Sequence, residues 1–240
     1  MRPRISVVMP THNRSNLISN AINSIKNQTI DDWELVIVDD GSDDSDITRE
    51  IVKRFDDSRI RYIYEDKIGM VAARNLGNME AKADIIALQD DDDLSMPDRL
   101  EKCLRIINTD EPVVVHGGYI NMWDAQYSCI GRKYFPPITN DNLLEGQIYP
   151  GVVVFMRDVW EKKPFRYETQ FAFDYMMHLD WVLSGVKYQF IHEGLYEYVR
   201  QQNSASITYE RDGRRKQAMD LIRDIVKKEY AKDISPNANL

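Results

Sequence analysis

The first half of the chain alternates between two hydrophobic patterns. Short, uninterrupted runs rich in β-branched residues recur along it at Ile5–Met9, Glu34–Val38, Ile60–Tyr64, Ile85–Leu88 and Val113–Val115. Such runs are typical of strands whose two faces are both covered by other elements. The pattern therefore predicts five buried strands in this half.

Between these runs, the apolar residues follow a helical period. The stripes are Leu17, Ile18, Ala21, Ile22 and Ile25, then Ile47, Ile51, Val52 and Phe55, and finally Leu100, Leu104 and Ile107. Pro97 lies at the expected first turn of the third helix, where proline is favoured. Strands that alternate with helices form βαβ units, so we expect an α/β fold with a mostly parallel central sheet flanked by helices.

The pattern changes after Gly117. Residues 117–150 show no sustained period, which predicts a loop-bearing insertion. Beyond it, the sequence predicts a strand at Val152–Met156, a helix at about 173–183, two short strands at 188–191 and 196–199, and a charged helix at about 212–231. The length of 240 residues suits one domain, or one domain with an appended lobe.

Charge and cysteine content narrow the function classes. The chain has 31 Lys and Arg against 39 Asp and Glu, a formal net charge of −8. Because nucleic acids and anionic membranes are polyanions, we expect neither as a general partner, whereas a bound cation suits this charge. Cys103 and Cys129 form no CxxC pair and are expected as reduced thiols. The apolar run Ile5–Met9 is too short for a signal peptide or a membrane span, which predicts a cytoplasmic protein.

Polar clusters follow three of the predicted strands. They are Pro10–Arg14, Asp39–Ser42 and the four consecutive aspartates Asp90–Asp93. Ligands of open α/β sheets bind beyond the carboxyl ends of the strands, so the clusters are expected at one rim. Four adjacent carboxylates repel one another, and a hard divalent cation such as Mg²⁺ or Mn²⁺ relieves that repulsion. In extended backbone, Asp90 and Asp92 would share one side, and Asp91 and Asp93 the other. The alternative is an exposed acidic turn that caps the next helix.

Three further candidates are each open to two interpretations. Asp40 belongs to an Asp/Gly cluster typical of turns, or its carboxylate accepts a hydrogen bond from a uracil ring or a ribose. His12 is an ordinary loop histidine, or a face for a base. Arg74, early in a predicted helix, forms a structural ion pair or reaches a phosphate.

Several segments, in this order, match the signatures of one known family. They are Ile5–Arg14, Ser24–Thr29 with Trp33–Ser42, Ala73–Gly77, and Asp90–Asp93 with Pro97–Leu100. Over about residues 3–206 the chain resembles the family 2 glycosyltransferases of the GT-A fold, which are mostly inverting enzymes of polysaccharide and glycan synthesis. In the second half, Pro150–Met156 is similar to the family's acceptor-side strand.

The resemblance implies roles for individual residues. Binding of the nucleotide sugar would involve Pro10, His12, Asp40, Arg74, Asp90 and Asp91. Asp40 would contact the nucleobase, and Asp92 would hold Mn²⁺ or Mg²⁺ on the diphosphate. Asp174 would be the catalytic base, in a place where the family commonly has Glu-Asp and this chain has Phe173 before Asp174. Asp180 lies six positions along the same helix and is expected to face away from Asp174.

The resemblance also implies the reaction. A single sugar would pass from a nucleotide-diphospho-sugar, with UDP as the expected nucleotide, to an acceptor hydroxyl with inversion. The acceptor would be a carbohydrate or a lipid-linked glycan. The Gln-x-x-Arg-Trp motif of processive synthases is absent from the sequence, and Gln201 stands near the place of a family histidine before Ser204–Ser206. The implied parts are a nucleotide-sugar-binding half (1–116), an acceptor-binding and catalytic half (117–206), and a C-terminal helix and tail (207–240).

Two rival functions use similar residues. A metal-dependent phosphoryl or nucleotidyl enzyme would also place an acidic pair after a strand, but the chain has no GxGxxG motif and no P-loop. A sugar-nucleotide-binding protein without activity would not need Asp174. The basic residues of the C-terminal helix suggest peripheral contact with the inner face of a membrane, whereas its interspersed acidic residues favour a packed helix with a solvated face.

Overall fold

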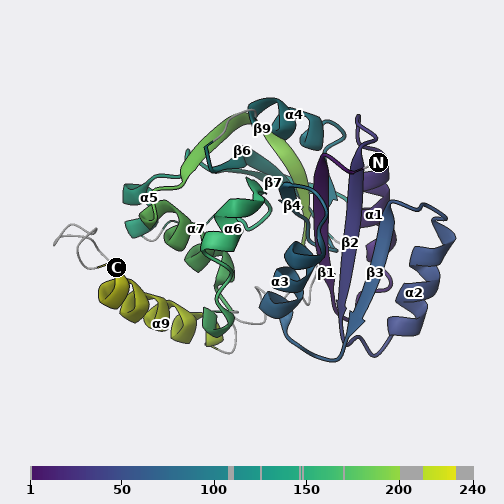
Figure 1. Ribbon diagram of the computed structural model, residues 1–240, viewed down its shortest axis with the longest axis horizontal. Helices are drawn as coiled ribbons and strands as arrows, with labels where there is room; N and C mark the ends of the chain where they lie inside the picture. Colours follow the sequence, from purple (N-terminus) through teal and green to yellow (C-terminus); the bar gives the residue numbers. More distant parts are fainter. Residues whose placement is uncertain are drawn as a thin grey trace.

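Within the residues that the structure describes, nine strands form one sheet with helices on both faces (Figure 1). The computed structural model describes residues 2–107, 111–124, 126–145, 147, 149–169, 171–200 and 213–230. The strands are β1 (Ile5–Thr11), β2 (Trp33–Asp40), β3 (Ile60–Glu65), β4 (Ile85–Leu88), β5 (Leu94–Ser95), β6 (Val113–Trp123), β7 (Cys129–Tyr134), β8 (Val154–Met156) and β9 (Lys187–Val199). The helices are α1 (Ile18–Lys26), α2 (Ser45–Arg54), α3 (Met70–Glu80), α4 (Arg99–Ile106), α5 (Asn140–Leu144), α6 (Arg157–Lys162), the 3-10 helix η1 (Tyr167–Thr169), α7 (Phe173–Leu183) and α9 (Arg214–Glu229). The predicted α/β class is confirmed.

The sheet has the order β3-β2-β1-β4-β8-β6-β9-β5, and β7 pairs with β6. β1, β2, β3 and β4 are parallel, as predicted. The second half is mixed, because β8 is antiparallel to both of its neighbours while β6 and β9 are parallel. β6 runs across residue 116, so the expected boundary between the two halves falls inside a strand. The division into halves stays a prediction about function.

Alternate residues of β1 serve two separate cores. Val7 and Met9 belong to the cluster that contains the apolar stripes of α1 and α4. Val8 faces the other way and packs with Val71 of α3. A Cβ atom at Gly77 would collide with the Val8 side chain, so glycine is what allows α3 to lie this close to the sheet. Because both faces are covered, the strand shows no polar alternation.

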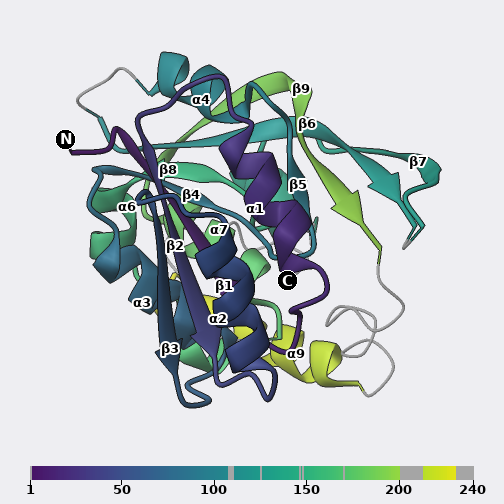
Figure 2. The same cartoon turned by 90° about the vertical axis from the view of Figure 1, so that its right-hand side faces the viewer.

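The prediction of a loop-bearing insertion at residues 117–150 is wrong for much of that segment. β6 continues to Trp123 and forms a hairpin with β7. Figure 2 shows this hairpin and the far end of β9 extending past the rest of the sheet. The physical reason is tertiary: β6 pairs with β9 along its whole length, with two register shifts, and no local pattern shows that partner. For the same reason, the two short strands predicted at 188–191 and 196–199 are one strand, β9.

An ion-pair network fastens α9 to the body of the protein. Arg166 Nε donates to Asp180 Oδ2 at 2.7 Å, and Arg166 Nη2 donates to Glu229 Oε2 at 2.6 Å. The hydroxyl of Tyr230, just past α9, donates to Asp180 Oδ1 at 2.6 Å. Asp180 is therefore a structural residue. It does not line the cavity that contains Asp174, which confirms the prediction that the two acids face apart.

The apolar face of α9 is packed against the protein. Ile222 and Val226 are fully buried, which favours the packed helix with a solvated face. Among the helices that the structure describes, none has the length and apolar character needed to cross a bilayer. The sequence features at Gln201 and Ser204–Ser206 lie outside the described residues.

Candidate active site

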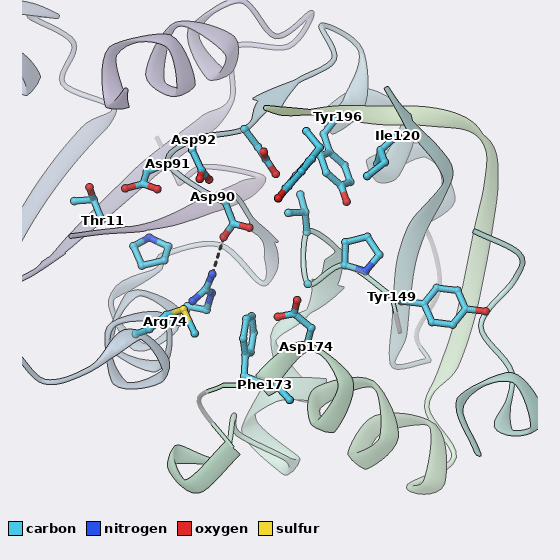
Figure 3. A pocket seen from close by; sticks show the side chains of 18 of the residues that line it. Thr11, Arg74, Asp90, Asp91, Asp92, Ile120, Tyr149, Phe173, Asp174 and Tyr196 are labelled. Carbon is cyan, nitrogen blue, oxygen red and sulfur yellow. Dashed lines mark hydrogen bonds and ion pairs between the residues drawn. The ribbon is translucent and has the colours of Figure 1, made fainter. Parts of the chain in front are cut away.

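A cavity of about 680 Å³ lies beyond the carboxyl ends of β1, β2 and β4, and residues of α7 and β9 complete its wall (Figure 3). The eight residues for which the resemblance implies a role in the site all line this cavity: Pro10, His12, Asp40, Arg74, Asp90, Asp91, Asp92 and Asp174. The fold thus brings together side chains that are far apart in the sequence. Their individual roles stay predictions.

The aspartate run forms a turn, so the predicted alternation of its side chains is wrong. The amide of Asp93 donates to the carbonyl oxygen of Asp90 at 3.3 Å, across the turn. Asp91 and Asp92, which extended backbone would point to opposite sides, both contact Arg14. Neighbouring carboxylates of a turn can share one cation, which extended backbone would not allow.

A buried network of side chains holds this turn in shape. Gln89 Nε2 donates to the carbonyl oxygens of both Asp90 and Asp93, each at 3.0 Å, and so draws the two ends of the run together. Arg99, fully buried at the start of α4, donates to Gln89 Oε1 at 2.8 Å and to the carbonyl oxygen of Leu88 at 2.7 Å. The conformation of the acidic run therefore depends on the core beneath it.

β9 holds the same turn from the other side. The amide of Val199 donates to Asp93 Oδ1 at 3.1 Å. The amide of Met96 donates to the carbonyl oxygen of Leu195 at 3.0 Å, next to the short antiparallel pairing of β5 with β9. Through its hydrogen bond with Val199, Asp93 thus links the aspartate turn to β9.

Burial weakens the acidity of three of the aspartates, Asp91, Asp92 and Asp93. Burial and the neighbouring carboxylates raise the pKa of Asp91 to about 7, against the opposing charge of Arg14. Burial also raises the pKa of Asp93 well above its ordinary value, and the adjacent carboxylates add to the effect. The turn therefore favours any further positive charge that enters the cavity.

Arg14 also lines the cavity, although the sequence motifs indicate no role for it beyond its place in the loop after β1. Its Nη1 lies 3.1 Å from Asp91 Oδ1 and also contacts Asp92 Oδ2. Burial lowers the pKa of Arg14, but the charges of Asp91 and Asp92 outweigh this and raise it above its ordinary value. Arg14 is therefore a permanent cation on the carboxylates that were expected to attract a metal. The sequence signal was its place, four residues after Pro10.

The two aspartates at the end of β2 have different roles, one in shaping the loop and one in lining the cavity. Asp39 is fully buried, and its Oδ1 accepts from the Ser42 amide at 2.8 Å, so it shapes the loop. Asp40 lines the cavity, and its Oδ1 accepts from the Gly69 amide at 2.8 Å. The backbone oxygen of Asp40 lies 2.7 Å from His12 Nδ1, which fixes the histidine ring beside it.

Arg74 joins the aspartate turn to α7. Its Nη2 donates to Asp90 Oδ1 at 2.6 Å, and its guanidinium carbon lies 4.2 Å from the centroid of the Phe173 ring. Phe173, which stands where the family commonly has glutamate, therefore packs on a cation. Arg74 Nη1 is buried and has no hydrogen-bond partner among the described residues. A buried charged donor without a partner is costly, so an anionic ligand group would complement it.

Asp174 lies in the first turn of α7, and Figure 3 shows its carboxylate directed into the cavity. A Cβ atom at Gly151 would lie 2.8 Å from Asp174 Oδ1, so the absence of a side chain there leaves room for the carboxylate. One turn further on, His178 is fully buried, with its Nε2 3.1 Å from the carbonyl oxygen of Pro150. Burial lowers the pKa of His178 to about 3, so it is a neutral core residue.

Another wall of the cavity comes largely from the segment that was predicted as loops. This wall is formed by Ile120, Met122, Lys133, Phe135 and Tyr149, together with Tyr196 and Tyr198 of β9. No periodic pattern marks Ile120 and Met122 in the sequence, because β6 is held extended by its pairing with the distant β9. The wall is mainly apolar and aromatic, which suits the flat faces of sugar rings.

The carboxylates of the turn fit a divalent cation that shares its ligands with a nucleotide. In the described part of the chain, no group of three or more His, Cys, Asp or Glu side chains forms a complete metal site. Asp92 offers a hard oxygen ligand, and Asp91 Oδ2 is buried without a hydrogen-bond partner among the described residues. A diphosphate would have to supply the other ligands, as the resemblance implies.

Asp92→Asn is expected to abolish the metal dependence of nucleotide binding, whereas Asp93→Asn should largely preserve it. Asp92 needs its charge to hold the cation, while an asparagine at position 93 keeps the oxygen that accepts from Val199. Calorimetry of UDP binding with Mn²⁺ and with EDTA measures both effects. Equal loss in the two variants would contradict the placement of the cation on Asp92.

The model of glycosyl transferase family 2 matches residues 6–170, which is more than half of the chain. The chain belongs to glycosyl transferase family 2. This confirms the resemblance seen in the sequence. The match covers β1 through η1 and includes the aspartate turn, but it ends before Asp174 and does not bear on the role of that residue.

The related glycosyltransferases differ in their sequence identity to this chain and in how much of their length it covers. It is 28% identical over 231 residues to the UDP-Glc:alpha-D-GlcNAc-diphosphoundecaprenol beta-1,3-glucosyltransferase WfgD of Escherichia coli, covering 95% of this chain and 88% of that protein. It is 34% identical to an uncharacterized glycosyltransferase of Rickettsia conorii, over 62% of this chain and 24% of the relative. The chain thus spans about a quarter of the length of several curated relatives that it matches.

Solved structures share the fold of this family 2 member at low sequence identity. The Staphylococcus aureus TarS 1–349 complex with UDP-GlcNAc has a TM-score of 0.72 at 18% identity, covering 99% of this chain and 68% of TarS 1–349. The mannosyltransferase PcManGT of Pyrobaculum calidifontis, in complex with GDP-Man and Mn²⁺, has a TM-score of 0.65 at 19% identity, covering 88% of this chain and 61% of PcManGT. These similarities confirm the predicted GT-A fold.

Proposed function

We propose that this chain is an inverting glycosyltransferase that moves a single sugar from a nucleotide-diphospho-sugar, in the first place a UDP-sugar, onto an acceptor hydroxyl. One observation supports the proposal most. A single cavity contains a carboxylate suited to a nucleobase, an acidic turn suited to a metal-bound diphosphate, and a separate carboxylate on α7. These groups are Asp40, Asp92 and Asp174. A protein that only bound nucleotide sugars would have no need of the third.

The donor's nucleotide would lie at the ends of β1 and β2. Asp40 would accept a hydrogen bond from the base, while the Gly69 amide holds its carboxylate in place. His12 is fixed against the Asp40 backbone and offers its ring beside the base. Arg74 Nη1, buried on the cavity wall, would donate to a diphosphate oxygen.

Charge at the leaving group would be balanced at the aspartate turn. A divalent cation bound there, Mn²⁺ or Mg²⁺, would neutralise the charge that develops on the departing nucleotide diphosphate. Asp92 would hold the cation, so Arg14 would have to release its contact with Asp92. Released from Asp92, Arg14 would remain next to the diphosphate as a second positive group.

Asp174 would accept the proton of the acceptor hydroxyl as that oxygen attacks the anomeric carbon. The first turn of a helix favours a negative charge, which keeps a carboxylate there ready to act as a base. Attack from the face opposite the leaving diphosphate inverts the configuration in one displacement. The apolar side chains of Ile120, Met122 and Phe135 in the cavity wall would hold the acceptor.

Relatives support the substrate classes. The name of WfgD describes transfer of glucose from UDP-Glc to a diphosphoundecaprenol-linked sugar. TarS binds UDP-GlcNAc, and PcManGT binds GDP-Man with Mn²⁺. We infer a carbohydrate or lipid-linked glycan as the acceptor and a role in polysaccharide or glycan biosynthesis.

UDP together with Mn²⁺ is expected to raise the melting temperature, and EDTA should remove the effect. A ligand at 100 times its dissociation constant stabilises the folded state by about 2.7 kcal/mol. The measurement is thermal unfolding with UDP, GDP and dTDP, each with Mn²⁺ and with EDTA. Stabilisation by UDP that persists in EDTA would contradict a metal-bridged site. A preference for GDP or dTDP would contradict only the assignment of uracil to Asp40.

A further inference from the structure

Tyr196 has a buried hydroxyl at the wall of the cavity. The residue lies on β9, is 4% exposed and lines the cavity wall. Its hydroxyl has no hydrogen-bond partner among the described residues. Figure 3 shows the hydroxyl directed into the cavity, on the side opposite Asp174. Neither the sequence motifs nor the proposed function has assigned it a task.

A phenol in this position is costly unless something in the cavity satisfies it. Buried hydroxyl groups nearly always have a partner, because a donor removed from water without one lowers the stability of the fold. Phenylalanine would fill the same space without that cost. Among the residues that the structure describes, nothing uses the oxygen atom in the ligand-free protein, and a bound molecule is what would use it.

The position of Tyr196 indicates which part of a ligand it meets. Antiparallel pairing of β5 with β9 places Tyr196 opposite Ser95, directly after the aspartate turn. Burial raises the pKa of the Tyr196 hydroxyl well above its ordinary value, and the charges of Asp93, Asp90 and Asp174 add to this. The residue thus borders the aspartate turn, and its hydroxyl, which Figure 3 shows across the cavity from Asp174, stays protonated.

We propose that the Tyr196 hydroxyl hydrogen-bonds the sugar that is transferred, and so makes the site prefer a nucleotide sugar over the bare nucleotide diphosphate. The inference rests on the proposed function, which puts the diphosphate at Asp92 and the acceptor oxygen at Asp174. The transferred sugar must lie between these two, and its ring hydroxyls can both donate to and accept from a phenol. Tyr196 is then a specificity-determining residue for the donor.

The test compares Tyr196→Phe with Tyr188→Phe. Tyr188 lies on the same strand outside the cavity, and its hydroxyl has a protein partner, His178 Nδ1 at 3.0 Å. Calorimetry with Mn²⁺ would give dissociation constants for UDP, UDP-Glc, UDP-GlcNAc and GDP-Man. Thermal and denaturant unfolding of each ligand-free variant would be measured alongside.

Tyr196→Phe should leave the ligand-free protein as stable as the wild type or more stable, and should leave UDP affinity unchanged. The affinity for the best nucleotide sugar should fall by roughly 5- to 20-fold, the effect of losing one hydrogen bond in a buried site. Tyr188→Phe should show the reverse: lower stability without ligand, and an unchanged ratio of nucleotide sugar to UDP affinity.

Three results would overturn the inference in distinguishable ways. If Tyr196→Phe destabilises the ligand-free protein as much as Tyr188→Phe does, the hydroxyl is already satisfied within the fold. If the affinity ratio is unchanged in Tyr196→Phe, the transferred sugar does not reach the residue. A wild-type protein that binds none of these nucleotides would overturn the proposed function, and this inference with it.

Discussion

Asp174→Asn should lower the turnover number by roughly 10²–10⁴-fold, the usual effect of losing a general base, while the affinity for UDP stays nearly the same. Asparagine keeps the size of the side chain but cannot accept the proton of the acceptor hydroxyl. The groups proposed to bind the donor, Asp40 and Asp92, lie at the ends of β2 and β4 and are untouched by this change. Turnover and UDP affinity would be measured on the same preparation once a donor and an acceptor are known.

A matched control for this variant is Asp141→Asn. Asp141 also lies in the first turn of a helix, α5, but it is exposed and does not line the cavity. It should keep both activity and UDP affinity. Asp180→Asn is unsuitable as a control, because Asp180 holds Arg166 and Tyr230 and its loss would disturb the packing of α9. Full activity in Asp174→Asn would move the base elsewhere.

Arg166→Met should lower the free energy of unfolding by about 3–5 kcal/mol, as expected when one partner of a buried ion pair is removed. The side chain of Asp180 is only 4% exposed and would be left with the Tyr230 hydroxyl as its remaining partner. Glu229 would lose its partner as well, so α9 should loosen first. Denaturant unfolding, followed by far-UV circular dichroism, measures the change.

Arg105→Met is the matched control for Arg166→Met. Arg105 pairs with Glu101 one turn away on α4, but its side chain is 72% exposed, and pairs of this kind contribute about 0.2–1 kcal/mol. If the two variants lose the same stability, the buried network is not what holds α9. If Arg166→Met unfolds in two steps, α9 separates before the rest of the domain.

The sequence was sufficient for the parts of the fold whose signal is local. Buried parallel strands are uninterrupted apolar runs, and β1, β2 and β4 lie where those runs predicted them. β3 also lies at its predicted place, but it is the edge strand and its residues are mostly half-buried, so the prediction that both its faces are covered is wrong. The rule that ligands bind beyond the carboxyl ends of such strands then brings His12, Asp40 and Asp90 to one rim. These three side chains do line one cavity, as the parallel order of their strands predicts.

The features that the sequence alone could not predict depend on contacts with residues far away along the chain. β6 contains Gly117 and Gly118, which are poor strand formers, and it is held extended by β9, whose pairing residues are more than 70 positions away. The aspartate run looked extended because its turn is imposed by Gln89 and Arg99 from the core. Arg14 gave no sign of its ion pair, because its carboxylate partners follow a different strand.

Two hydrogen bonds connect β9 to the aspartate turn and the residues after it, and they affect local unfolding. One runs from the Val199 amide to Asp93 Oδ1, and the other from the Met96 amide to the Leu195 carbonyl oxygen. Val199 cannot leave the turn without freeing Asp93, and Leu195 cannot move without freeing the Met96 amide. The turn and this stretch of strand therefore open and close as one cooperative unit, with one free energy of local opening. Tyr196 lines the cavity and lies between Leu195 and Val199, the two residues that make these hydrogen bonds. A ligand that contacts Tyr196 therefore lowers the opening frequency of the whole unit. Slower amide exchange would follow at Val199, which does not itself line the cavity.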